Sequence, residues 1–172
     1  MRVSASDFEL FGVPERFEQD RAALEARWKE LQREAHPDRF AAQGAAAQRV
    51  ALQWSVRINE AYQRLKDPLR RAAYLCELRG APIRAEDNTA MPADFLLQQM
   101  QWREALDDAH TESELDALND GLQAARREAL ADIAQALDAD ANPARAAQQV
   151  RALMFIERFA DEVDTKLDRL QA

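Results

Sequence analysis

The chain has 172 residues and a formal net charge of −8, from 23 Lys and Arg against 31 Asp and Glu. Such an acidic chain argues against binding to nucleic acid, because neutralising phosphates requires clustered Lys and Arg. No apolar stretch is long enough to span a membrane, the first residues lack the apolar core of a secretory signal, and one cysteine cannot form an internal disulfide. We therefore expect a cytoplasmic protein that binds neither nucleic acid nor membrane.

The charge is unevenly distributed along the chain. Residues 1–76 carry 13 Lys and Arg and 11 Asp and Glu, a net charge of +2, whereas residues 77–172 carry 10 and 20, a net charge of −10. This split suggests two surfaces with different partners; the alternative is an acidic surface that is merely solvated.

The composition predicts an all-α protein. Glycine is scarce, with 4 residues, and Ala, Leu, Glu, Gln and Arg are abundant, while no alternating β-branched run indicates a strand. Apolar residues recur on one helical face in two early segments: Leu24, Trp28, Leu31 and Ala35, then Val50, Trp54, Ile58, Ala61 and Leu65. In chain order, the predicted helices cover residues 5–12, 19–35, 47–66, 69–79, 92–109, 112–138 and 143–171.

The helices at 19–35 and 47–66 are expected to pack as an antiparallel hairpin, because the polar loop that joins them at 36–46 is short. The tripeptide His36-Pro37-Asp38 opens this loop. Proline fixes its own φ and favours extended backbone at the preceding residue, so the helix must end there and the loop presents His36 and Asp38 outward. From the residues alone, the tripeptide is either a functional tip or an ordinary turn between helices.

The outer face of the helix at 19–35 carries several basic residues. Lys29 and Arg33 project about 140–180° away from Leu24 at 100° per residue. Arg27 lies on the flank of the apolar stripe, and Arg39 follows the tripeptide. Glutamates are interspersed among them, so the alternative to a basic binding face is a solvated face of mixed charge.

A proline- and glycine-containing stretch at 80–91 predicts a junction between a first domain at 1–79 and a C-terminal three-helix bundle at 92–172. The second and third helices of the bundle begin with typical capping pairs, Thr111 with Glu114 and Asn142 with Pro143.

The first helix of this bundle carries apolar residues on two faces. Phe95, Trp102 and Leu106 share one face, which is enough to seat the helix on its neighbours. A second group lies about 100–200° further round and is edged by acids; it comprises Leu96, Leu97, Met100, Glu104 and Asp108. An apolar patch off the core face is typical of a partner site, and methionine suits adaptable contacts. The alternative is a wide core stripe, or packing of Leu96 on another helix.

Catalytic and metal-binding patterns are scarce. Two histidines and one cysteine cannot build a zinc site of the usual spacing. Asp107 and His110 resemble half of a di-iron bundle motif, but no second half exists, so a metalloenzyme is the least favoured alternative. No Walker A motif, glycine-rich phosphate loop or nucleophile elbow is present. Cys76 lies on an apolar helix face and is predicted to be a buried thiol.

The sequence around His36-Pro37-Asp38 resembles a J-domain, the module that activates the ATPase of heat-shock chaperones. Residues 6–14, SDFELFGVP, are similar to the first J-domain helix and its exit turn. Residues 58–75, INEAYQRLKDPLRRAAYL, are similar to the end of the third helix and the start of the last. The FxLFG start and the PLRRAxYL run resemble the HscB family, the J-proteins devoted to iron–sulfur cluster assembly, and the resemblance covers essentially the whole chain.

The resemblance implies an N-terminal J-domain hairpin followed by a C-terminal three-helix bundle that binds a scaffold protein. It implies a co-chaperone, not an enzyme, that stimulates an HscA-type ATPase, delivers the iron–sulfur scaffold IscU to it, and needs no cofactor or metal. The main alternative is a J-protein with a different client.

Two sets of contact residues follow from the resemblance. The chaperone-binding residues would be His36, Pro37, Asp38, Arg27, Lys29, Arg33 and Arg39. The scaffold-binding residues would be Leu96, Leu97, Met100, Gln101, Glu104, Asp108 and Phe155. Arg39 replaces the usual lysine and keeps its charge, Asp108 is a shorter acid, and Gln101 replaces a glutamate, which puts its part in binding in question.

Overall fold

The computed structural model describes residues 5–172, and these residues form helices and no strand. The all-α prediction is therefore confirmed. Contacts within the chain divide it into two units, the first ending at Tyr74 and the second beginning at Leu75, inside one helix. Among the described residues, no helix combines the length and the apolar character needed to cross a bilayer.

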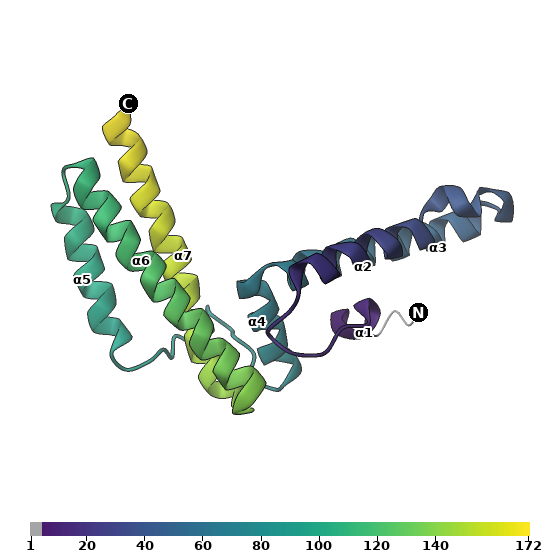
Figure 1. Cartoon of the computed structure of the whole chain (residues 1–172), viewed down its shortest axis with the longest axis horizontal. Helices are drawn as coiled ribbons and strands as arrows, with labels where there is room; N and C mark the ends of the chain where they lie inside the picture. Colours follow the sequence, from purple (N-terminus) through teal and green to yellow (C-terminus); the bar gives the residue numbers. More distant parts are fainter. Residues whose placement is uncertain (1–4) are drawn as a thin grey trace. The chain divides into compact units, whose positions relative to one another are not determined.

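The first unit is built around a two-helix hairpin. Its elements are α1 (Asp7–Phe11), α2 (Arg21–Glu34), the short 3-10 helix η1 (Pro37–Gln43), α3 (Ala45–Lys66) and the first residues of α4 (Pro68–Leu78). Helices α2 and α3 run antiparallel side by side, and α1 packs against both (Figure 1). Leu24 and Leu31 of α2 are buried, as are Ile58 and Leu65 of α3, so the predicted apolar stripes do form the core.

Two local predictions in this unit were wrong. The segment expected as a loop at 36–46 is largely the 3-10 helix η1, and α3 begins at Ala45. Val50, placed in the core stripe of α3, is 52% exposed, whereas Ala51 is buried. Ala51, Ile58 and Leu65 recur every seven residues along the buried line of α3, and Val50 lies about 100° away from Ala51 on the helical wheel.

The second unit contains the last residues of α4 and the three-helix bundle. The bundle consists of α5 (Phe95–Asp108), α6 (Glu112–Ala134) followed by a π-helical turn η2 (Gln135–Ala139), and α7 (Pro143–Gln171). Helices α6 and α7 pack along their length, and α5 lies beside them (Figure 1). Both predicted caps are present: the Thr111 hydroxyl accepts from the Glu114 N–H, and the Asn142 side chain accepts from the Arg145 N–H.

The end of α6 differs from the prediction of a regular helix to residue 138. Its last turn is π-helical, and the carbonyl of Leu137 accepts a hydrogen bond at 2.7 Å from Arg79, just beyond α4. The helix α4 itself ends as predicted before Gly80, whose φ of +82° suits glycine. Cys76 is buried and free, as predicted, and burial raises the pKa of its thiol to about 11.

Candidate functional site

The tip of the α2–α3 hairpin presents two polar side chains on a fixed backbone. His36 has extended backbone (φ −63°, ψ 128°) and caps η1, with its Nδ1 accepting a hydrogen bond at 3.2 Å from the Asp38 N–H. Because Nδ1 is engaged within the tip, Nε2 is the ring nitrogen that is left to face a partner. The His36 side chain is 58% exposed and that of Asp38 is 91% exposed. The tip therefore offers an imidazole edge and a carboxylate to a partner.

The predicted basic residues near this tip divide into tethered and projecting side chains. Arg27 Nε donates to the Phe11 carbonyl at 3.2 Å, and its guanidinium pairs with Glu30, so Arg27 ties α2 to the end of α1. Arg39 donates to the carbonyl of Arg33, and so caps the C-terminal end of α2. Lys29 pairs with Glu25 on its own helix, and both side chains are more than half exposed.

A shallow hollow of about 500 Å³ adjoins the tip and is lined by Gln32, Arg33, His36 and Arg39. Three of these four residues were predicted from the sequence. Gln32 was missed, and its position one turn before His36 was the available signal. Its amide also donates to Asn59 of α3 at 2.7 Å, which fixes the inner wall of the hollow.

In the second unit, the predicted patch on α5 is exposed. Leu96, Leu97 and Met100 are 65%, 60% and 62% exposed, although leucine and methionine are usually buried. Trp102 and Leu106, on the opposite face, are buried and seat the helix as predicted. The polar residues of the predicted site, Gln101, Glu104 and Asp108, are also exposed.

A groove of about 580 Å³ gathers part of this patch. It is lined by Leu96, Gln99, Met100, Arg103, Glu104, Asp107, Asp108 and Phe155. It includes five of the seven predicted scaffold-binding residues, while Leu97 and Gln101 lie outside it. Sequence reasoning missed Gln99, Arg103 and Asp107, which follow the same side of α5 at helical spacing.

Phe155, which the resemblance assigns to the scaffold-binding set, also packs in the aromatic core of the bundle. Its ring lies against Phe95 at 5.8 Å between centroids, stacks on Phe159 at 5.7 Å and faces Trp102 at 6.4 Å. These four rings seat α5 on α7. Phe155 is nevertheless partly exposed and lines the groove, so it belongs both to the support and to the surface.

A helical hairpin with His36-Pro37-Asp38 at its tip, followed by a helical bundle, defines the class of J-domain co-chaperones. The chain is 49% identical over 169 residues to a protein of Burkholderia thailandensis and 51% identical over 172 residues to one of Ralstonia nicotianae. These matches cover at least 96% of every chain, and both relatives are named co-chaperone protein HscB homolog. The chain belongs to the HscB family of co-chaperones.

The family and the fold are also supported by other comparisons. Residues 91–164 match the family described as the HSCB C-terminal oligomerisation domain. The structure of the chaperone HscB from Vibrio cholerae is 38% identical and superposes with a TM-score of 0.81, covering 96% of this chain and 99% of that one. The human co-chaperone protein HscB shares the fold, with a TM-score of 0.87 at 24% identity, covering 96% of this chain and 84% of the human one.

Within residues 5–172, no three His, Cys, Asp or Glu side chains come together in a way that could hold a metal ion. The relatives are named as co-chaperones and not as enzymes.

Proposed function

We propose that the chain stimulates the ATPase of an HscA-type heat-shock chaperone and delivers the iron–sulfur scaffold IscU to it, in the maturation of iron–sulfur proteins. The chain would act by bringing its two partners together and would catalyse no covalent chemistry itself. Two modest binding sites on one chain raise the effective concentration of client at the chaperone. The reduced, buried Cys76 is compatible with the cytoplasm as the place of action.

The observation that carries the proposal is that each unit exposes its own predicted site. In the first unit, His36 and Asp38 project from a tip whose backbone is fixed by Pro37. In the second, Leu96 and Met100 line an open groove in a bundle that already has an aromatic core. A J-protein without a dedicated client on its bundle has no reason to keep such leucines in water.

The two sites predict two separable losses of function. Asp38→Asn should abolish stimulation of the chaperone ATPase while leaving scaffold binding and thermal stability unchanged, because exposed loop positions move stability by only about ±0.5 kcal/mol. The double variant Leu96→Ala, Met100→Ala should lose scaffold binding but still stimulate the basal ATPase. Steady-state ATP turnover with and without scaffold, together with isothermal titration, measures both effects.

Matched controls are available in each unit. Glu9→Gln makes the same charge change on the exposed side of α1. Leu170→Ala truncates an exposed leucine that lies on α7 and not on α5. Both controls should behave as wild type. Full stimulation by Asp38→Asn would contradict the role of the tip, and full scaffold binding by the double variant would leave the bundle with a different client.

A further inference from the structure

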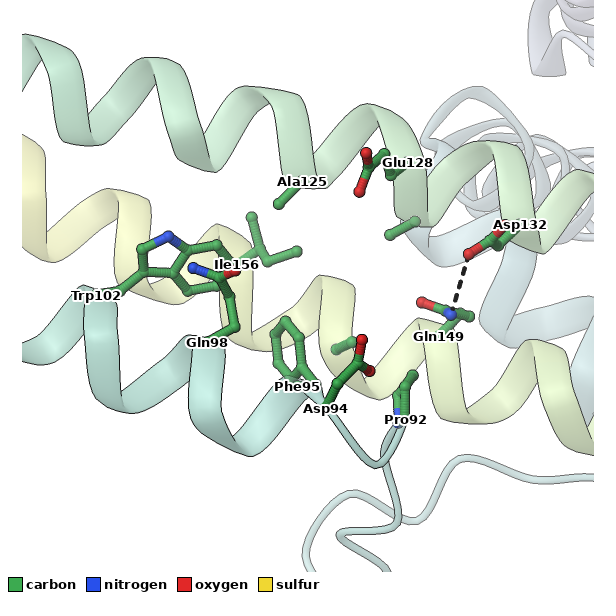
Figure 2. Close-up of a pocket in the computed structure, with 12 residues that line it drawn as sticks. Pro92, Asp94, Phe95, Gln98, Trp102, Ala125, Glu128, Asp132, Gln149 and Ile156 are labelled. Carbon is green, nitrogen blue, oxygen red and sulfur yellow. Dashed lines mark hydrogen bonds between the residues drawn. The ribbon is translucent and has the colours of Figure 1, made fainter.

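A second hollow lies on the other flank of α5. It is a cavity of about 190 Å³ between the start of α5 and the facing sides of α6 and α7 (Figure 2). Gln98 lines this cavity, whereas Arg103 lines the groove described above. The two residues are five positions apart in α5, and at 100° per residue their side chains point about 140° apart around the helix axis. The cavity is therefore distinct from the groove, and the exposed residues Leu97 and Gln101 lie on the surface of α5 between them.

The lining of this cavity carries one sign of charge. Asp94, Glu128 and Asp132 contribute three carboxylates, and among the described residues no Lys, Arg or His lines it. Gln149 donates to Asp132 at 3.2 Å, as Figure 2 shows. Asp94 stands at the N-cap of α5 but makes no side-chain capping bond, and within residues 5–172 neither its carboxylate nor that of Glu128 has a hydrogen-bond or ion-pair partner. A concave site of this kind concentrates negative potential.

The remaining walls are apolar and aromatic. The rings of Phe95 and Trp102 border the cavity (Figure 2), and Ala129, Ala152 and Ile156 also line it. Aromatic faces attract cations, and an apolar lining suits the methylene groups of a long side chain. At about 30 Å³ per water, the cavity holds the volume of about six waters, well below the roughly 300 Å³ or more of small-molecule sites. It is the size of one side chain.

We propose that this cavity receives an arginine side chain of the protein that docks on α5. A guanidinium pairs with a carboxylate through parallel hydrogen bonds and stacks on an aromatic ring at the same time, which an ammonium does less well. Leu97 lies on α5 between the cavity and the residues Leu96 and Met100. A partner that docks on Leu96 and Met100 and also covers Leu97 would therefore reach the cavity without leaving the surface of α5. The proposal rests on the proposed function, because it takes the docked protein to be the scaffold.

The test compares two double variants of the full chain that change the charge equally. Asp94→Asn, Glu128→Gln removes two of the three carboxylates of the cavity, and Asp116→Asn, Asp120→Asn removes two exposed carboxylates of α6 outside it. Hydrogen bonds to charged groups are strong enough that the cavity variant should bind the scaffold at least about tenfold more weakly by isothermal titration. The control should stay within about twofold of wild type, and thermal unfolding checks that all three proteins are folded.

A small-molecule probe tests the chemistry of the cavity directly. Acetyl-arginine amide should shift the NMR signal of the Trp102 indole N–H in the wild-type chain but not in the cavity variant, whereas the neutral isostere acetyl-citrulline amide should shift neither. Equal shifts from both probes, no shift from the arginine probe, or unchanged scaffold affinity of the cavity variant would overturn the arginine pocket alone. Failure of the wild-type chain to bind scaffold would instead overturn the proposed function, and with it the named partner.

Discussion

The two units support their predicted sites in different ways. In the first unit, the tip is shaped by backbone geometry at Pro37, and the polar network that stabilises the unit lies elsewhere, around Asp7 of α1. In the second unit, the support is an aromatic cluster, and one of its rings, Phe155, also lines the groove. Stability and binding should therefore separate cleanly in the first unit and only partly in the second.

The support of the first unit is a buried ionic cluster. The Asp7 carboxylate is 0% exposed; Arg57 pairs with it at 2.8 Å, and Arg64 donates to both of its oxygens. The Asp7 N–H donates to the Tyr74 hydroxyl, which links α1 to α4. The cluster raises the pKa of Arg64 above its ordinary value, chiefly through the hydrogen bond to Asp7. Such a cluster is specific in geometry, but it depends on every member being present.

The largest expected effect is on the aromatic support of the second unit. Trp102→Ala should destabilise this unit by about 3–5 kcal/mol, because it empties a well-packed site among three other rings. Alkylation of Cys76 in urea measures the opening of this unit, since the buried thiol with a pKa of about 11 is protected at pH 8. Leu97→Ala on the exposed side of α5 should change stability by no more than about 0.5 kcal/mol. Similar Cys76 reactivity in both variants would contradict the aromatic support.

The ionic support of the first unit should be slightly less costly to break. Asp7→Asn leaves Arg57 and Arg64 without their common carboxylate and should destabilise the unit by about 3 kcal/mol, at the lower end of values for buried pairs because Arg64 is partly exposed. Thermal unfolding followed by circular dichroism measures the loss, with the exposed Glu9→Gln as control. If Asp7→Asn melts like the control, the cluster is not the support of this unit.

The third prediction separates support from surface within the groove. Leu96→Ala and Met100→Ala should each weaken scaffold binding by about 2 kcal/mol without changing the melting temperature by more than a few degrees, because both side chains are exposed. Phe155→Ala should lower binding and stability together, because it removes one of four packed rings. Titration calorimetry and thermal unfolding of the same samples measure both quantities. A fully stable Phe155→Ala would restore the simpler interpretation of Phe155 as a surface residue.

Much of the fold was predictable because its signals are local. The periodic stripes through Leu24 and Ile58, the caps at Asn142 and Thr111, and the glycine after α4 each depend on residues within a turn or two. The π-helical turn after α6 was not predictable, since its Leu137 carbonyl is satisfied by Arg79, 58 residues away in the chain.

The exposure of the predicted site residues could be anticipated from the sequence, but their arrangement in space could not. The exposure of Leu96 and Met100 follows from the wheel of one helix, because the buried Trp102 and Leu106 and the partly buried Phe95 already occupy its inner face. The double role of Phe155 depends on how α5 lies against α7, which no single-helix pattern contains. The carboxylate-lined cavity likewise draws on three separate helices, so its residues carry no common signal in the sequence.

The smallest expected effect concerns the basic residues around the tip. The side chains of Lys29 and Arg33 are exposed on α2, so they should act by steering the chaperone towards the tip and not by holding it. Each should contribute about 1 kcal/mol or less. Stimulation should weaken as salt reduces the Debye length from about 8 Å to about 3 Å, and Lys29→Ala, Arg33→Ala should flatten that dependence. The chaperone concentration for half-maximal stimulation, measured across salt concentrations, checks this prediction.

Arg27→Ala provides the contrast, because losing its bond to the Phe11 carbonyl should lower the melting temperature instead. Salt-independent stimulation by the wild-type chain would show that the basic face is merely solvated, and the tip would then act by its geometry alone.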